Sequence, residues 1–275
     1  MSIPADSSRT NAIDWNEASK TFDRWLPYIQ PVAEALLSLA DLSEGHEILD
    51  VASGTGEPSL TIAWRFGSTL QITAVDGAEA MVAIANEKLR REGLSGVTFQ
   101  QMKAEALAFP SNQFDRVISR FGVMLFDDSL LGLKEMRRVL KEGGTLAISV
   151  WGEFHRIQSI HLIWELIMKR LPLKERPSLP KMADLGPTGK LEALLQSAGF
   201  RQFQIRPLPL LYRFDDFETY WTITTESGTL REPLDRFTPA EQEEIKEEAL
   251  QCISSFVREG KIIMENQALL ANAVK

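Results

Sequence analysis

The chain has 275 residues, 44% of them hydrophobic, and carries a formal net charge of −8. This length allows a large core, in one big domain or in a domain with a cap. The acidic balance disfavours nucleic acid and anionic membrane surfaces as partners, since both require a basic face. Cys252 is the only cysteine, which excludes an intrachain disulfide and a multi-cysteine metal site.

The N-terminal stretch Met1–Lys20 is polar and has neither an apolar run nor a basic region ahead of one. It therefore does not read as a signal peptide or an anchor. No stretch approaches the roughly 20 apolar residues that span a bilayer. Together with the single cysteine, these features lead us to expect a cytoplasmic protein with no membrane insertion.

Residues 1–30 form a segment ahead of the main domain, which we expect to occupy residues 31–275. Phe22, Trp25 and Tyr28 make an aromatic cluster in this segment. Pro31 suits the first position of a helix that is predicted to run to Asp41.

Strand and helix patterns then alternate along the chain. The predicted strands are 47–51, 70–75, 97–101, 114–119 and 144–151, and the predicted helices are 58–66, 78–91 and 129–140. Such alternation implies right-handed βαβ units and a doubly wound, mostly parallel sheet. The nearly continuous apolar run EILDV fits a strand that is covered on both faces.

The pattern changes after residue 151. We predict a helix over 156–170, a proline-rich crossing loop over 171–187, a helix over 190–197 and a strand over 202–206. An inserted helical piece follows over 215–260, and a closing edge strand over 267–274. The expected fold is α/β, with a doubly wound, seven-stranded Rossmann-like sheet and helical cap insertions near 152–187 and 215–260.

A glycine turn follows the first predicted strand, in the sequence DVASGTGEPS over 50–59. Gly54 and Gly56 permit a tight turn and let a ligand approach the backbone, and Pro58 favours a helix start. Free N–H groups at the start of a helix favour an electron-rich ligand group. An ordinary strand-to-helix turn would use the same residues, so this motif alone leaves both interpretations open.

Asp76 follows the next apolar strand, twenty residues after Gly56. An acidic residue at this place in a doubly wound sheet binds ribose hydroxyls. Asp76 also suits the start of the following helix, and both roles are compatible. A dinucleotide motif would place a third glycine at Ser59, so a ligand without pyrophosphate fits better.

The segment ILDVASGTGEPSL resembles the first motif of class I S-adenosylmethionine-dependent methyltransferases, in the small-molecule group related to ubiquinone and menaquinone biosynthesis. The segments AVDGAEAMVAIA, KAEALAFPSNQFDRVISRFGVMLF, EMRRVLKEGGTLAISVW and LEALLQSAGF resemble later family motifs. The resemblance covers Thr21–Ile205. It implies S-adenosyl-L-methionine as the cofactor and Thr21–Tyr28 as a lid over it, although simple packing would also explain these aromatic residues.

The chain departs from this family at two positions. Lys103 occupies the place of the aspartate that often binds the adenine amino group, and a lysine cannot accept that hydrogen bond. Met124 lies near the place of a frequent histidine. We therefore expect Ala104, Glu105 and Met81 to hold adenine.

Ligands bind at the carboxyl ends of strands in open α/β sheets, which selects the remaining candidates. The predicted cofactor-binding residues are Asp50, Ser53, Gly54, Thr55, Gly56, Asp76, Gly77, Met81, Ala104, Glu105, Ser119 and Arg120. The predicted substrate pocket consists of Phe22, Trp25, Met124, Trp151, Trp164 and Trp221.

His155 is the best candidate base among three histidines, because it follows a strand at the expected end of the sheet. His46 precedes the first strand, and His161 lies on an apolar helix. Asp127 and Asp128 lack a matching Asp-Asn pair after residue 151, so we expect no metal.

The predicted function is transfer of a methyl group to a small, largely apolar acceptor through an O, N or C atom. Two alternatives remain. An NAD-dependent oxidoreductase would share the sheet and Asp76 but would prefer glycine at Ser59. A non-catalytic nucleoside-binding protein would bind the cofactor without turnover.

Overall fold

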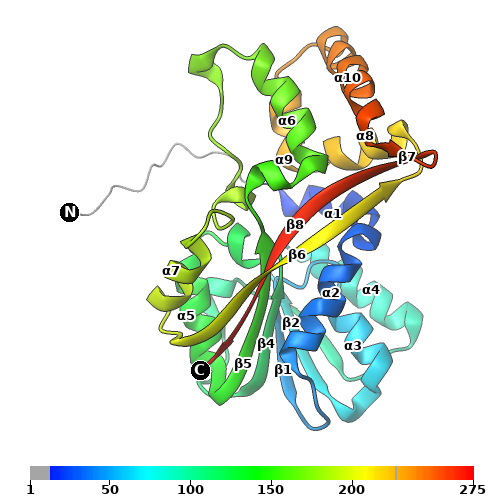
Figure 1. The fold of residues 1–275 in the computed structure, drawn as a ribbon. Helices are drawn as coiled ribbons and strands as arrows, with labels where there is room; N and C mark the ends of the chain where they lie inside the picture. The colour runs from blue at the N-terminus through cyan, green and yellow to red at the C-terminus, as the bar shows by residue number, and fades with distance from the viewer. Residues whose placement is uncertain (1–12, 227) are drawn as a thin grey trace.

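The computed structural model describes residues 13–226 and 228–275. Its centre is a mixed sheet in which the strands follow the order β3-β2-β1-β4-β5-β8-β6 (Figure 1). This path of seven strands confirms the doubly wound α/β class. A short eighth strand, β7 (Val257–Arg258), pairs with β8 in a hairpin outside the path.

The parallel half of the sheet consists of β3 (Val97–Gln101), β2 (Gln71–Asp76), β1 (Glu47–Val51), β4 (Phe114–Arg120) and β5 (Leu140–Trp151). The chain order reverses between β1 and β4, because β2 and β3 lie on one side of β1 and β4 lies on the other. In such sheets the crevice at this reversal, outside the carboxyl ends of the strands, is the usual ligand site.

Helices cover both faces of this half (Figure 1). One face carries α2 (Leu26–Ala40), α3 (Ser59–Phe66) and α4 (Glu79–Glu92), and the other carries α5 (Ser129–Val139) and α7 (Lys190–Ser197). The strands are apolar along nearly their whole length because each face is covered; Ile48, Leu49 and Ile118, for example, have no exposed surface.

The antiparallel half of the sheet differs from the prediction, which placed the last strand of the chain at the edge. The last strand, β8 (Lys261–Val274), is longer than 267–274 and lies between β5 and β6, so it is an interior strand. The edge is β6 (Gln202–Phe214), which also extends beyond the expected 202–206. The two strands pair from Gln202–Val274 to Phe214–Ile262, and this pairing explains the extra length.

The far ends of β6 and β8 rise above the parallel strands and carry a helical cap (Figure 1). Three helices lie between these two strands in sequence, namely α8 (Phe217–Thr225), α9 (Gly228–Leu234) and α10 (Pro239–Ile253). They pack with α6 (Gln158–Arg170), which follows β5. The two predicted insertions therefore meet in one cap, which stands at the carboxyl ends of the parallel strands.

The remaining short elements are 3-10 turns: η1 (Asp23–Trp25), η2 (Gly67–Thr69), η3 (Ala104–Ala106), η4 (Val123–Leu125), η5 (Phe154–Arg156), η6 (Leu173–Glu175), η7 (Lys181–Ala183) and η8 (Ser254–Phe256). No helix of the residues 13–226 and 228–275 is both long and apolar enough to cross a membrane.

The N-terminal region is more helical than the sequence suggested. The first helix, α1 (Trp15–Phe22), begins with the Asp14 side chain, which accepts hydrogen bonds from the backbone of Asn16 and Glu17. After η1, helix α2 starts at Leu26 rather than at Pro31, and Pro31 lies inside it. Figure 1 shows α1 between the sheet and the cap, so this segment closes one side of the space between them.

Candidate active site

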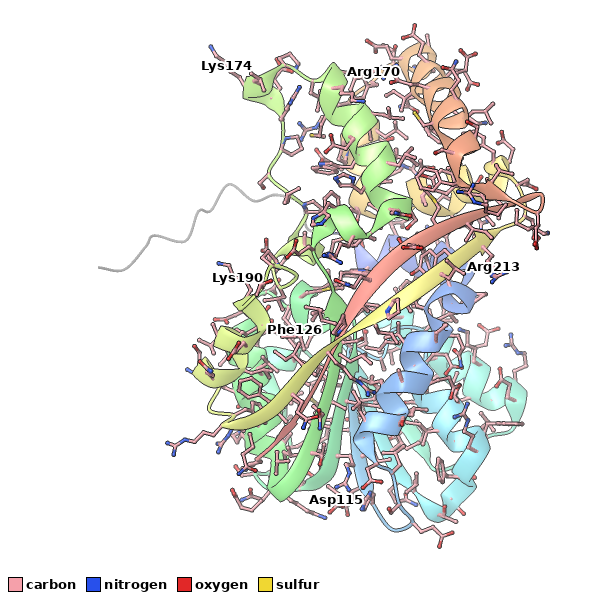
Figure 2. The ribbon with its side chains drawn as sticks, viewed as in Figure 1. Asp115, Phe126, Arg170, Lys174, Lys190 and Arg213 are labelled. Atoms are coloured by element: carbon pink, nitrogen blue, oxygen red, sulfur yellow. The ribbon has the colours of Figure 1, made fainter. Side chains whose placement is uncertain are left out.

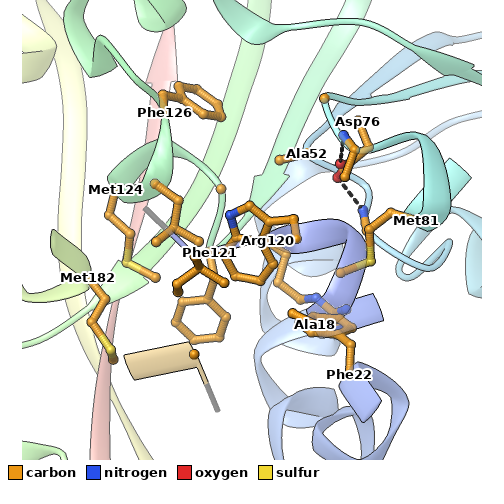
Figure 3. Close-up of a pocket in the computed structure, with 18 of the residues that line it drawn as sticks. Ala18, Phe22, Ala52, Asp76, Met81, Arg120, Phe121, Met124, Phe126 and Met182 are labelled. Atoms are coloured by element: carbon orange, nitrogen blue, oxygen red, sulfur yellow. Dashed lines mark hydrogen bonds between the residues drawn. The ribbon is translucent and has the colours of Figure 1, made fainter. Parts of the chain in front are cut away.

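A cavity of about 470 Å³ lies between the carboxyl ends of the parallel strands, helix α1 and the cap. Gly54 of the glycine turn, Asp76 of β2 and Arg120 of β4 line it from the sheet. Phe22 lines it from α1, and Met182 from η7. Figure 3 shows Phe22, Asp76, Arg120 and Met182 around one space. In Figure 2, Phe126, which also lines the cavity, lies between the sheet and the cap.

The glycine turn is held in place by a hydrogen bond to Asp76, the last residue of β2. The backbone N–H of Gly54 donates to Asp76 Oδ2 at 2.8 Å, and the N–H of Ala78 donates to Asp76 Oδ1 at 2.9 Å. Gly54 has φ +55°, a left-handed conformation that glycine adopts without strain. The Asp76 carboxylate therefore connects the turn to the start of α4.

Asp76 retains the chemistry needed to bind ribose. Burial raises the pKa of this carboxyl, while its hydrogen bonds from Ala78 and Gly54 lower the pKa. Each carboxylate oxygen has two acceptor positions, and the backbone occupies only one on each. The other positions are available to ribose hydroxyls, so the residues present fit a nucleoside.

Asp50 has a different environment from Asp76, although the sequence analysis predicted a cofactor role for both. It has no exposed surface, and its Oδ2 accepts a hydrogen bond from Ser59 Oγ at 2.7 Å. Burial raises the pKa of Asp50 to about 7, against the lowering effect of Ser59 and Arg120. Asp50 lies outside the cavity lining and supports the turn from below.

The N-terminal segment contacts the glycine turn directly. Thr55 Oγ1 donates a hydrogen bond of 2.6 Å to Asp23 Oδ1, and Lys88 of α4 pairs with the same carboxylate at 2.7 Å. Phe22 lies against Gly54, with a ring carbon 3.5 Å from where a Cβ would stand. Three parts of the chain thus meet at Asp23, and the aromatic residues of this segment lie at the cavity.

The other half of the cavity is apolar. Phe121 stacks on Trp151, with ring centroids 4.3 Å apart and an interplanar angle of 21°. Met124, Ile160 and Met182 line the cavity near this pair. Phe121 has φ +59°, a strained conformation for a bulky residue, and such strain is concentrated at functional sites.

Lys103 lies at the exposed rim of the cavity. Its ammonium pairs with Asp127 at 2.9 Å, and both side chains are more than two-thirds exposed. The hydrogen bond to Asp127 raises the pKa of Lys103 and lowers that of Asp127. Lys103 thus has a carboxylate partner in the structure, and the neighbouring Met102 and Ala104 line the cavity beside it.

The structure brings many of the predicted site residues together around this cavity. From the predicted cofactor set, the lining residues are Gly54, Asp76, Gly77, Met81, Ala104, Glu105 and Arg120. From the predicted substrate set, they are Phe22, Trp25, Met124 and Trp151. Ser53, Thr55, Gly56 and Ser119 lie outside the lining, as Asp50 does.

Three other predicted residues lie away from the cavity lining. His155 is on η5 with its side chain 60% exposed, and its Nδ1 is 3.5 Å from Glu153 Oε2. Trp164 is buried against the ring of Phe154 within the cap, and Trp221 packs on Phe217. The roles assigned to them from the sequence stay predictions, and none has a contact with the cavity.

Several cavity residues had no signal that the sequence analysis used. Trp15 and Asn16 of α1, Phe121, Met182 and Thr229 all line the space. Phe121 directly follows the predicted site residue Arg120 at the end of a predicted strand, so the sequence did contain a signal for its position. The others come from the N-terminal helix and the cap, which only tertiary packing brings over the sheet.

The fold and the site together define an α/β protein whose glycine turn and Asp76 carboxylate suit a nucleoside cofactor, with an apolar compartment beside them. Comparison with known proteins makes the class specific. Residues 48–144 match a family described as a methyltransferase domain. The demethylmenaquinone methyltransferase of Porphyromonas gingivalis is 33% identical over 178 residues, which is 60% of this chain and 72% of that protein.

Another curated relative matches a shorter part. The ubiquinone/menaquinone biosynthesis C-methyltransferase UbiE of Shewanella halifaxensis is 36% identical over 142 residues, so the match spans 51% of this chain and about half, 53%, of that relative. The crystal structure of YcgJ from Bacillus subtilis matches with a TM-score of 0.62 at 20% sequence identity. The match covers 90% of this chain and 98% of the YcgJ chain. This structural likeness supports the fold.

The chain belongs to the class I S-adenosylmethionine-dependent methyltransferases, and S-adenosyl-L-methionine is its cofactor. This confirms the family resemblance of the sequence motifs. The dehydrogenase alternative has no support in the family match.

Proposed function

We propose that this protein transfers a methyl group from S-adenosylmethionine to a small, largely apolar acceptor molecule. The observation that carries the proposal is the joining of two unlike compartments in one cavity. One contains Gly54 and Asp76, which suit a nucleoside, and the other contains the stacked pair Phe121 and Trp151. A molecule in the apolar compartment would lie next to a cofactor held at the turn.

The bound cofactor supplies a sulfonium methyl group that the acceptor's nucleophilic atom takes, leaving S-adenosylhomocysteine and, where that atom carried hydrogen, a proton. The sulfonium already activates the methyl group, so the main task of the chain is alignment. In this proposal Asp76 and Gly54 hold one end of the cofactor. Phe22 and Trp25 exclude water from the cofactor side, since both line the cavity.

Asp76, Gly54, Gly77, Met81, Ala104 and Glu105 are the proposed cofactor residues that line the cavity, and Met124 and Trp151 are proposed acceptor contacts. Glu105 accepts a hydrogen bond of 3.1 Å from the Asp128 backbone, which orients its carboxylate. Ala104 is buried beside it and offers its backbone to adenine. The acidic balance and the single cysteine support a small-molecule acceptor rather than nucleic acid, and a cytoplasmic location.

Binding and turnover test this proposal separately. We expect isothermal titration calorimetry to show binding of S-adenosylhomocysteine and none of NAD. Incubation with methyl-labelled S-adenosylmethionine and a panel of phenols, quinols, amines and carboxylates should label at least one acceptor. Binding of NAD alone would contradict the proposal, and cofactor binding without turnover over a broad panel would favour a non-catalytic nucleoside-binding protein.

A further inference from the structure

The carboxylates that line the cavity all have partners within the described residues. Asp14 caps α1, Asp76 holds the glycine turn, Glu105 accepts from the Asp128 backbone, Asp127 pairs with Lys103, and Glu226 pairs with Arg24. Each of these acidic groups, and Lys103 with them, thus has at least one hydrogen-bonded or ionic partner within the protein.

Arg120 is different from these groups. It lies at the end of β4, lines the cavity and is only 7% exposed. Its Nη1 atom is enclosed and has no hydrogen-bond partner among the described residues. Figure 3 shows Arg120 in the middle of the cavity residues, between Met124 on one side and Asp76 and Met81 on the other.

The charges near Arg120 do not replace a direct partner. Burial lowers the pKa of Arg120, and the nearby groups Glu57 and Asp50 oppose this lowering only in part. Asp50 Oδ2 accepts from Ser59, and the Glu57 carboxylate accepts from Thr61 at 2.7 Å. Asp50 Oδ1, like Arg120 Nη1, has no hydrogen-bond partner among the described residues, so neither carboxylate pairs with Nη1. An arginine remains protonated in proteins, so a buried cation with unused donors faces the cavity.

A buried charge without a hydrogen-bonded partner is costly, and an anionic ligand would remove that cost. The position of Arg120 in the cavity indicates which ligand supplies this anionic group. Arg120 is separated from Asp76 by β1, so their strands are about two strand spacings, roughly 10 Å, apart. Its next residue is Phe121, which stacks on Trp151 in the apolar compartment. The cation therefore lies on the acceptor side of the cavity.

We propose that the acceptor carries an acidic oxygen, as a carboxylate or a phenolate on an apolar skeleton, and that the guanidinium of Arg120 binds this oxygen. This inference rests on the proposed function, because it assumes that the apolar compartment holds the acceptor. A guanidinium has planar paired donors that match a carboxylate, and Phe121 and Trp151 supply flat apolar surface for the skeleton.

The test measures binding of matched probes to the protein saturated with S-adenosylhomocysteine. The probes are 2-naphthoate and 2-naphthamide, which have the same ring system and differ in charge. We expect calorimetry to show at least tenfold tighter binding of 2-naphthoate. Arg120→Gln should abolish this preference, and Arg120→Lys, which keeps the charge, should retain part of it.

Arg213→Gln is the matched control. Arg213 is exposed on β6, near the cap end of the strand and away from the cavity lining (Figure 2). This variant should keep the full preference for 2-naphthoate. If Arg120→Gln does not fold, the comparison of the wild-type protein with Arg120→Lys still decides the matter.

Two results would overturn the inference. One is equal binding of the two probes, or binding of neither, by the wild-type protein. The other is a preference that survives in Arg120→Gln while S-adenosylhomocysteine binds more weakly and 5′-methylthioadenosine, which lacks the amino-acid group, binds as before. That pattern would assign Arg120 to the carboxylate of the cofactor. Cofactor affinity itself reports on the proposed function, so the two failures are distinguishable.

Discussion

At the scale of single residues, the same residue type has different roles because its surroundings differ. Asp50 lies in the strand before the glycine turn and Asp76 ends the next strand, yet Asp50 is fully buried outside the cavity lining and Asp76 lines the cavity. The sequence predicted a cofactor role for both. Alternation of side chains along a strand and the pairing of Asp50 with Ser59 explain why only one of them reaches the cavity.

Replacement of Asp76 by alanine should weaken cofactor binding. The ribose hydroxyls would lose their acceptor and the Gly54 N–H its partner, so we expect a loss of about 1–3 kcal/mol in the binding free energy of S-adenosylhomocysteine. Calorimetry measures it, with Asp215→Asn as a control because Asp215 is an exposed residue of the cap end that pairs with Lys261. Unchanged affinity in Asp76→Ala would refute the ribose role.

Gly122 offers a test of packing beside the site. A Cβ at this position would stand 2.5 Å from Ser119 Oγ and 2.6 Å from the Ala52 Cβ. Gly122→Ala should therefore lower the free energy of unfolding by about 1–3 kcal/mol in urea titrations. Gly77→Ala is the control, because its Cβ would meet only the Lys103 side chain at 3.9 Å. Equal stability of the two variants would contradict this packing argument.

At the scale of elements, periodicity predicted the parallel half of the sheet well and the antiparallel half less well. Strands covered on both faces have continuous apolar runs, which are easy to recognise. The outer parts of β6 and β8 are long, alternate between buried and exposed residues, and pair with each other far from the parallel strands. The length of β6 and β8 follows from this pairing, and the local sequence pattern of either strand does not predict it.

The contact of the N-terminal segment with the glycine turn is another element-scale feature. Asp23 binds both Thr55 and Lys88, so Asp23→Asn removes an ion pair and weakens a hydrogen bond. A loss of about 1 kcal/mol in the local opening free energy corresponds to about fivefold faster amide hydrogen exchange over α1 and η1.

Hydrogen exchange with mass spectrometry measures this effect, and exchange in β1 and β4 should not change. Glu17→Gln serves as the control, since it disrupts only the exposed pair with Lys20. Exchange over α1 that is the same in Asp23→Asn as in the unaltered protein would show that other contacts hold this segment.

At the scale of the whole molecule, the buried carboxyl of Asp50 couples folding to pH. Its pKa rises from 3.8 to about 7 because burial disfavours the charged form. Between these values the folded state binds more protons at Asp50 than the unfolded state does. Asp50 therefore stabilises the folded state most below about pH 4. This contribution to the free energy of unfolding decreases as the pH rises to about 7.

Asp50→Asn should remove this contribution. Urea unfolding at several values between pH 4 and pH 7 should show a less negative slope of stability against pH in the variant than in the unaltered protein. Acidic groups with lowered pKa, such as Asp115 and Glu135, have the opposite slope in both proteins and cancel in the difference. Identical slopes would contradict a raised pKa for Asp50.

The sequence by itself determined the parallel sheet, the glycine turn, Asp76 and the methyltransferase class, because these depend on local apolar runs and on residues at fixed spacing along the chain. Only the tertiary structure decided which residues share the cavity. It placed α1 and the cap over the strand ends, left His155 and Trp164 outside the cavity lining, and buried Arg120 at the cavity with no partner for its Nη1 among the described residues. These outcomes depend on packing between segments that are far apart in sequence. Burial and long-range strand pairing determine this packing together, so it cannot be predicted from any single segment.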